Sequence, residues 1–240
     1  MGAKKKGGGK KKAAAADEVE DVSVHQFFKA YKAKTKELGV DLQKYIKEKY
    51  DLYCEEDEKI EKFNLWEELG WAGTRAIMDS LRHVNYPHCK SIRFWKTYCE
   101  DEGVRAICQF IELGKGTLFL ELLDNKITSL GCEFIARALH PRVNPTIQIL
   151  KLDHNEFGAA GVNQLSEALA INPVLRVLSL TYCGIDHTAA QALFEILIYT
   201  RSALEEVNLS GNSLGNEGTC RVLMGTAIAK SLKKIYLADN

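Results

Sequence analysis

The residues best suited to chemistry are histidines and cysteines, which could bind a metal ion or act as nucleophiles. His83, His88 and Cys89 lie close together around a proline. No fourth ligand follows them at the spacing of a zinc site, so the sequence predicts no metal ion there. The seven cysteines are irregularly spaced and include no C-x-x-C pair, which argues against a disulfide framework. We expect reduced thiols, most of them buried.

Two short segments resemble ligand-binding loops but lack residues that such loops need. In DHNEFG (153–158), Phe157 stands at a ligand position of a calcium loop, and Gln164 replaces the bidentate glutamate. GKGT (114–117) lacks the adjacent lysine and serine or threonine of a phosphate-binding loop. The sequence therefore predicts no catalytic residue, no cofactor and no small-molecule substrate.

The composition is that of a globular protein. The chain has 240 residues, of which 46% are hydrophobic and 27% charged, with 32 basic and 32 acidic side chains. This length fits one domain, or one domain with an appendage, and the balance excludes collagen-like and wholly disordered chains. Because no long uncharged apolar stretch occurs, neither a membrane span nor a signal peptide is expected. We predict a cytoplasmic protein.

The first 22 residues form a separate electrostatic segment. Glycine and lysine cannot bury apolar surface, so we expect residues 1–22, a basic and then an acidic tail, to be disordered. Such a block serves either as a solubilising leader or as an electrostatic tether to an acidic surface. The tether would consist of Lys4, Lys5, Lys6, Lys10, Lys11 and Lys12.

An internal repeat organises the rest of the chain. Six segments fit the pattern apolar-x-x-apolar-x-apolar-x-x-Asn, with Thr117, Thr97 and Cys183 as tolerated exceptions. The steps between their last residues are 28, 30, 28, 29 and 28. Each segment alternates like a strand, and helical spacing of apolar residues follows it, so one unit is strand, turn and helix. The segments are 89–97, 117–125, 147–155, 175–183, 204–212 and 232–240.

This pattern over residues 88–240 resembles the leucine-rich repeat family, in particular its ribonuclease-inhibitor-like class. The resemblance implies an α/β solenoid, with a curved parallel sheet inside and helices outside. It also implies that the side-chain amides of Asn125, Asn155, Asn212 and Asn240 satisfy backbone groups of adjacent turns. Thr97 and Cys183 interrupt that series, so regular spacing is in doubt at those two turns.

Residues 23–87 are predicted to form a helical amino-terminal cap with a degenerate repeat. Apolar spacing indicates helices over 24–38 and from about residue 42 onward. LGWAG (69–73) matches FGAAG (157–161), but the charged segment 55–68 reads as helix, so the strand half of this unit is expected to be missing. The cap would cover the open edge of the first strand.

The last repeat segment is predicted to leave an open sheet edge. Leu232, Ile235 and Leu237 would lie there without a covering helix. An exposed parallel edge is an aggregation hazard that proteins normally cover. Two interpretations stay open: a fragment or frayed terminal unit, or a place where another subunit docks.

The concave sheet face is the predicted binding surface. Its charges are mixed in sign, which argues against nucleic acid as the partner. Trp95 is either a partner contact or part of the packing under the cap helices. The candidate protein-binding residues are Arg93, Trp95, Glu121, Lys151, Asp153, Tyr182, Asn208 and Tyr236.

Two functions follow from the resemblance. The first is a non-catalytic scaffold that binds other proteins, such as a structural subunit of the ciliary or flagellar axoneme, because proteins there are similar in pairing lysine-glycine starts with such repeats. Acidic tubulin tails would then suit the lysine tether. The second is a regulator of an enzyme or small GTPase, similar to ribonuclease inhibitors or Ran GTPase-activating proteins, with Arg93 as a nominal match to the activators' arginine.

Overall fold

The computed structural model describes residues 21–114, 116–143 and 146–240, in which helices and strands alternate along the chain. The six lysines of the predicted tether lie outside the described residues. The elements are α1 (Ser23–Leu38), α2 (Lys44–Glu56), β1 (Lys62–Leu65), α3 (Gly70–His83), β2 (Ser91–Trp95), α4 (Glu100–Ile111), β3 (Phe119–Leu123), α5 (Ser129–Leu139), β4 (Ile149–Lys151), α6 (Gly158–Leu169), β5 (Val177–Ser179), η1 (His187–Ala189), α7 (Ala190–Ile198), β6 (Glu206–Asn208), α8 (Gly215–Ile228) and β7 (Lys234–Tyr236).

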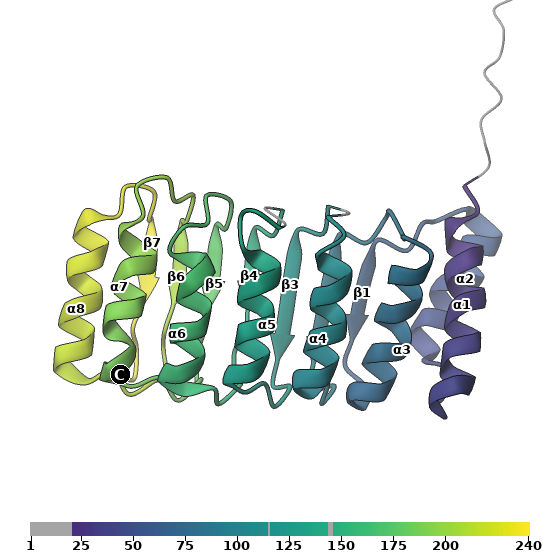
Figure 1. Cartoon of the computed structure of the whole chain (residues 1–240), viewed down its shortest axis with the longest axis horizontal. Coiled ribbons are helices and arrows are strands. Elements are labelled where there is room, and N and C mark those ends of the chain that lie inside the picture. Colours follow the sequence, from purple (N-terminus) through teal and green to yellow (C-terminus); the bar gives the residue numbers. More distant parts are fainter. Residues whose placement is uncertain (1–20, 115, 144–145) are drawn as a thin grey trace, which may run out of the picture.

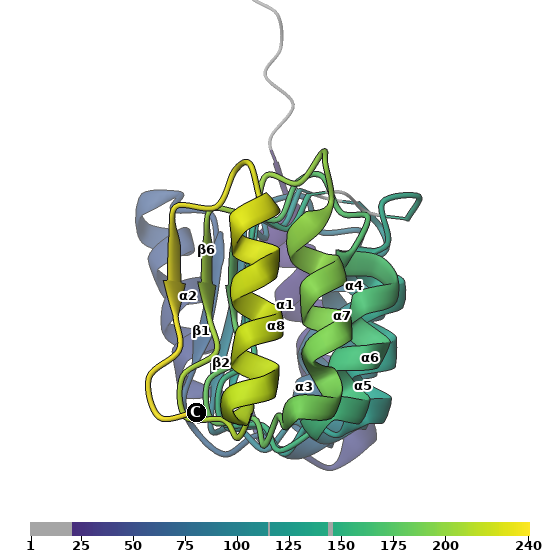
Figure 2. The same cartoon turned by 90° about the vertical axis from the view of Figure 1, so that its left-hand side faces the viewer.

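The strands form one parallel sheet in chain order, from β1 to β7. Helices α3 to α8 cover one face of this sheet, and the other face stays open except near β1, where α2 lies (Figures 1 and 2). Each crossover therefore consists of one helix, as parallel neighbours require. The predicted α/β solenoid of leucine-rich repeats is confirmed.

Equivalent apolar residues of successive units stack in register to form the core. Ile92, Leu120, Leu150 and Leu178 are consecutive partners across β2 to β5 and are fully or almost fully buried. A single strand-and-helix unit could not bury both of its faces, so the units stabilise one another by stacking. The shared row holds the strands in a fixed register, because a slip by one residue would turn core side chains outward.

The expected absence of a strand in 55–68 is wrong. β1 pairs with β2 throughout, and Leu65 lies opposite Phe94. Ile60, Phe63 and Leu65 are buried and have the same apolar spacing as the later units. The charged residues between them occupy positions that face away from the core, so charge there does not oppose a strand.

The described end of the predicted tail is also folded, which corrects its boundary at residue 22. Asp21 Oδ1 accepts the backbone N–H of Ser23 at 3.0 Å, and Asp21 Oδ2 lies 2.5 Å from His88 Nε2. The hydroxyl of Tyr53 donates to the Asp21 carbonyl at 2.8 Å. The backbone hydrogen bond from Ser23, with smaller contributions from its hydroxyl and from His88, lowers the pKa of Asp21 to about 2. Asp21 thus ties the start of α1 to α2 and to the segment before β2.

Asparagine side chains form a ladder along the edge where the strands end, as the family resemblance implied. Asn125 Oδ1 accepts from the backbone N–H of Thr97 at 3.0 Å and from the Thr97 hydroxyl at 2.8 Å. At Cys183 the ladder continues with a thiol, which donates to the carbonyls of Leu152 and Thr181 at 3.4 and 3.3 Å. The two irregular residues therefore keep the spacing of the turns, and the doubt about them is removed.

Burial separates the cysteines into two groups. Cys54 and Cys220 are exposed, whereas Cys89, Cys99, Cys108, Cys132 and Cys183 are buried. Burial disfavours the thiolate and raises the pKa of Cys89, Cys99 and Cys183 to about 12. All seven are free thiols, so the prediction of reduced and mostly buried cysteines is confirmed.

The helices of the described ranges are too short or too polar to cross a membrane.

Candidate functional site

The open face of the sheet is built from every second residue of each strand. Side chains alternate between the two faces of a strand, and the parallel register lines up equivalent residues of neighbouring strands. Arg93 of β2 therefore lies beside Glu121 of β3, which lies beside Lys151 of β4. The open face is a series of rows that run across the strands.

One row is aromatic and exposed. Trp95 lies beside Leu123, and Trp66 follows β1 as Trp95 follows Phe94 in β2. Trp66 and Trp95 are 64% and 62% exposed, and Leu123 is half-buried. The ring of Tyr45 from α2 meets Trp66 edge-on at 6.1 Å between centroids. We call Trp66, Trp95 and Leu123 the aromatic row. The exposure of Trp95 contradicts the interpretation that it packs under the cap helices.

The next row is held by ion pairs. Glu121 Oε1 lies 3.3 Å from Arg93 Nε and 3.8 Å from Lys151 Nζ. Arg93 also lies over the ring of Phe119, 5.6 Å from its centroid. These contacts fix the guanidinium on the sheet, beside the aromatic row.

Two of the candidate binding residues have structural roles. Asp153 is buried, and its Oδ1 accepts from the Ser179 hydroxyl at 2.6 Å and from the backbone N–H of Thr181 at 2.8 Å. Its carboxylate is used inside the molecule, so Asp153 is not available to a partner. The Asn208 side chain accepts from the backbone N–H of Ser210 at 3.1 Å and is half-buried.

Tyr182 and Tyr236 are exposed at different places. Tyr236 belongs to β7 and lies on the open face. Tyr182 lies in the turn after β5 with a left-handed backbone, φ 51°, and stacks on His154 with the ring centroids 4.9 Å apart. Tyr182 therefore lies at the edge where the strands end, rather than on the sheet face.

Sequence reasoning missed four residues of the open face: Trp66, Phe119, Ile149 and Val177. Trp66 was lost because its segment read as helix, although the apolar spacing of Ile60, Phe63 and Leu65 was a usable signal. The other three are half-buried strand residues beside one another in the register. They are apolar at positions that face outward, which the repeat pattern leaves undefined.

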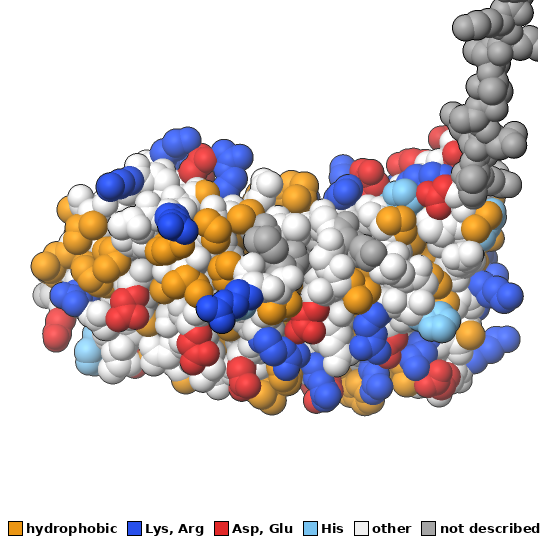
Figure 3. Space-filling model, turned by 45° about the horizontal axis from the view of Figure 1, so that its top comes forward, with side chains coloured by type: hydrophobic (Ala, Val, Ile, Leu, Met, Phe, Trp, Pro, Cys, Tyr) orange, Lys and Arg blue, Asp and Glu red, His pale blue; other side chains and the backbone are white. Residues whose placement is uncertain are grey.

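The residues of the predicted open edge belong to β7 or flank it. Leu232, Ile235 and Leu237 are half-buried and pack against the core. On the helical side of the same end, Leu223, Met224 and Ile228 of α8 are exposed. Figure 3 shows hydrophobic side chains gathered over this end of the molecule.

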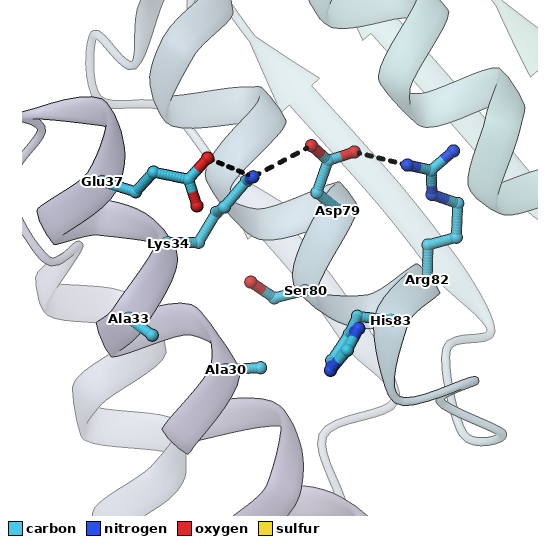
Figure 4. A pocket seen from close by; sticks show the side chains of 8 residues that line it. All are labelled: Ala30, Ala33, Lys34, Glu37, Asp79, Ser80, Arg82 and His83. Atoms are coloured by element: carbon cyan, nitrogen blue, oxygen red, sulfur yellow. Dashed lines mark hydrogen bonds and ion pairs between the residues drawn. The ribbon is translucent and has the colours of Figure 1, made fainter.

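A hollow of about 510 Å³ separates α1 from α3 on the helical side (Figure 4). Asp79 is one of its lining residues, and its carboxylate lies 3.9 Å from Lys34 Nζ, 3.2 Å from Arg75 Nε and 3.4 Å from an Arg82 nitrogen. Arg75 and Arg82 pair with Asp79 within α3, and Lys34 is the cation that reaches this carboxylate from α1.

The histidine and cysteine cluster that the sequence singled out is not assembled. His88 pairs with Asp21, and Cys89 is buried. In the described part of the chain, no three His, Cys, Asp or Glu side chains are placed to hold a metal ion together.

A family model described as Leucine Rich repeat matches residues 143–166, 172–194 and 203–218. These ranges hold β4, β5 and β6, most of α6, and the starts of α7 and α8.

Relatives with related sequences are larger proteins. The chain is 33% identical to human "NACHT, LRR and PYD domains-containing protein 13" over 65% of its own length and 13% of that protein. It is 30% identical to the pig "Ribonuclease inhibitor" over 51% of its own length and 27% of that protein. Among solved structures, "Leiomodin-1 Actin-Binding Site 2 (ABS2)" matches with a TM-score of 0.48 and 19% identity, over 63% of this chain and 86% of that one. The chain thus spans about a quarter or less of the length of these two curated relatives.

Proposed function

The chain is a leucine-rich repeat protein of the ribonuclease-inhibitor-like class, and from this premise we propose that it acts without catalysis, by binding another protein on its open sheet face. The observation that carries this proposal is the aromatic row. Two adjacent tryptophans are more than half exposed on a rigid sheet. Tryptophan is among the residue types that dominate the binding energy of protein interfaces, and an exposed pair costs free energy in water that a partner would recover.

The test removes both indole rings. The variant Trp66→Ala/Trp95→Ala should bind its partner at least about thirty-fold more weakly, because the loss of even one hot-spot tryptophan costs about 2 kcal/mol or more. Quantitative crosslinking mass spectrometry on native extract, with the purified chain as bait, compares the variant with the wild-type chain. Trp71→Ala is the matched control, since Trp71 is exposed on α3, away from the sheet face. Equal capture by both variants would contradict the proposal.

The same experiment separates the scaffold from an alternative. Similarity to ribonuclease inhibitor favours a regulator that binds an enzyme. In that case the captured protein is an enzyme whose turnover changes on binding. The nominal activator arginine, Arg93, lies 3.3 Å from Glu121 and over the ring of Phe119 on the open sheet face.

We further propose that the protein is a cytoplasmic structural subunit of a cytoskeletal assembly such as the ciliary axoneme. The six lysines within the first 12 residues support this proposal, since they suit the acidic tails of tubulin. Association with microtubules should be released by salt, because lysine contacts to an exposed polyanion are screened within about 10 Å at 0.1 M. Cosedimentation of the full chain and of a variant without residues 1–12 measures this. Unchanged binding and salt dependence after the deletion would leave the segment as a solubilising leader.

A further inference from the structure

The half of the open face nearest the strand starts combines an apolar floor with projecting cations. Phe119, Ile149 and Val177 are neighbours in the register and form the floor. With Arg176 and residues around it they line a hollow of about 400 Å³. We call this surface the basic strip. Its residues are Arg93, Phe119, Ile149, Lys151, Arg176, Val177, Lys233 and Lys234, with Glu121, Glu205 and Glu206 between them.

The carboxylates of the strip are less exposed to solvent than the cations that pair with them. Glu205 is 28% exposed, whereas its partners Arg176 and Lys233, at 2.5 and 2.7 Å, are 53% and 67% exposed. The side chain of Glu121 is 14% exposed, and both of its cationic partners are more open to solvent. The same order holds for Glu206 and Lys234. A partner therefore meets the cations first.

The cations retain hydrogen-bonding capacity after these pairs are made. Arginine carries five N–H donors and lysine three, so one shared carboxylate cannot satisfy two such groups. The hydrogen bond from Lys233, followed by that from Arg176, lowers the pKa of Glu205, so this carboxylate is held as an anion by the two cations. Among the described residues of these pairs there are five cations and three carboxylates, so the strip carries an excess of positive charge.

We propose that the basic strip binds an acidic segment of another protein that also carries apolar side chains. This deepens the proposed function, on which it rests, by naming the chemistry of a partner for a second part of the same face. Carboxylates of the segment would pair with the projecting cations, and its apolar side chains would cover Phe119, Ile149 and Val177. A phosphate backbone has no apolar groups to pack on this floor, so a peptide fits the strip better than a nucleic acid does.

Fluorescence anisotropy with a labelled peptide of alternating glutamate and leucine tests the proposal on the full chain. The expected result is salt-sensitive binding that is lost when the glutamates are replaced by lysine and weakened when the leucines are replaced by serine. Equal binding of the lysine peptide, or tighter binding of a single-stranded oligonucleotide, would overturn it.

Two variants locate the binding site. Arg176→Glu/Lys233→Glu should weaken binding of the glutamate-leucine peptide at least about ten-fold, or ~1.4 kcal/mol. Ile149→Gln should weaken it without a change of charge. The control Lys36→Glu/Arg105→Glu reverses two exposed charges on α1 and α4, away from the strip, and should bind as the wild-type chain does. Circular dichroism confirms that each variant is folded.

The outcomes separate this proposal from the first one. If no peptide binds while Trp66→Ala/Trp95→Ala still abolishes partner capture, the strip proposal fails and the proposed function stands. If the peptide binds while Trp66→Ala/Trp95→Ala captures the partner as well as the wild-type chain does, the proposal that the aromatic row binds the partner fails instead. Self-association in the ultracentrifuge that Arg176→Glu/Lys233→Glu removes would make a second copy of the chain the occupant, and would also overturn the strip proposal.

Discussion

Replacing Asn155 with alanine is expected to lower the free energy of unfolding by about 3–5 kcal/mol, since a buried polar group left without a partner costs about 1–3 kcal/mol. Asn155 Oδ1 accepts the backbone N–H groups of Asn125 and Ile127 at 2.8 and 3.1 Å. Asn155 Nδ2 donates to the carbonyls of Leu122 and Leu152, each at 2.7 Å. Alanine would leave the two N–H groups and the Leu122 carbonyl without this partner, and the Leu152 carbonyl with only the weak bond from the Cys183 thiol. Urea unfolding followed by circular dichroism measures the change.

Two matched variants test whether the ladder is the cause. Asn240→Ala removes the same kind of side chain at an exposed turn, where water can replace it, and should cost about 1 kcal/mol or less. Cys183→Asn places an amide where a thiol now makes weak bonds, and should increase stability by up to about 1 kcal/mol. Equal losses at residues 155 and 240 would show that burial of the ladder does not matter.

Gly161→Ala is the second large effect, with an expected loss of about 2–3 kcal/mol from overpacking. A Cβ atom at Gly161 would lie 2.7 Å from the Cβ of Phe157, which is buried. Since a Cβ cannot rotate away, the start of α6 would have to move. Thermal and urea unfolding of the variant measure the loss.

Ala189 provides the control, because it occupies the equivalent position one unit later. There the chain begins its helix with the 3-10 turn His187–Ala189 before α7, and the Ala189 side chain is buried. Ala189→Gly should therefore change stability by about 1 kcal/mol or less. A Gly161→Ala variant as stable as the wild-type chain would mean that the start of α6 accommodates a Cβ atom as the start of the next helix does at Ala189.

The repeat made most of the fold predictable. Core residues such as Leu120, Leu150 and Leu178 recur at one place in each unit, so their spacing reports both the strand and its register. The same alignment located the asparagines, and the resemblance to leucine-rich repeats implied that they bond to adjacent turns. The unit with β1 escaped because the alternation of Phe63 and Leu65 is short and is surrounded by glutamate and lysine, which made the segment look helical.

The binding surface was less predictable, for a physical reason. A repeat constrains the residues that pack and leaves the outward positions free, so sequence could name Arg93 and Lys151 but not which atoms stay available. The repeat pattern placed Asp153 on the concave face, but its carboxylate accepts hydrogen bonds from Ser179 and Thr181 inside the molecule. The relative heights of Glu205 and its cationic partners depend on side-chain conformations, which no spacing encodes.

Because of the asparagine ladder, insertions should be tolerated at one edge of the sheet and not at the other. From Thr97 onward, a buried residue follows each ladder position after two residues, and another in the helix after ten, as with Ile127 and Ile135 after Asn125. The variation among the steps of 28, 29 and 30 residues falls instead between each helix and the next strand. Insertions or affinity tags placed in those connections would leave every hydrogen bond of the ladder intact. One residue added between a strand and the next helix, where the ladder lies, would disrupt the ladder's hydrogen bonds.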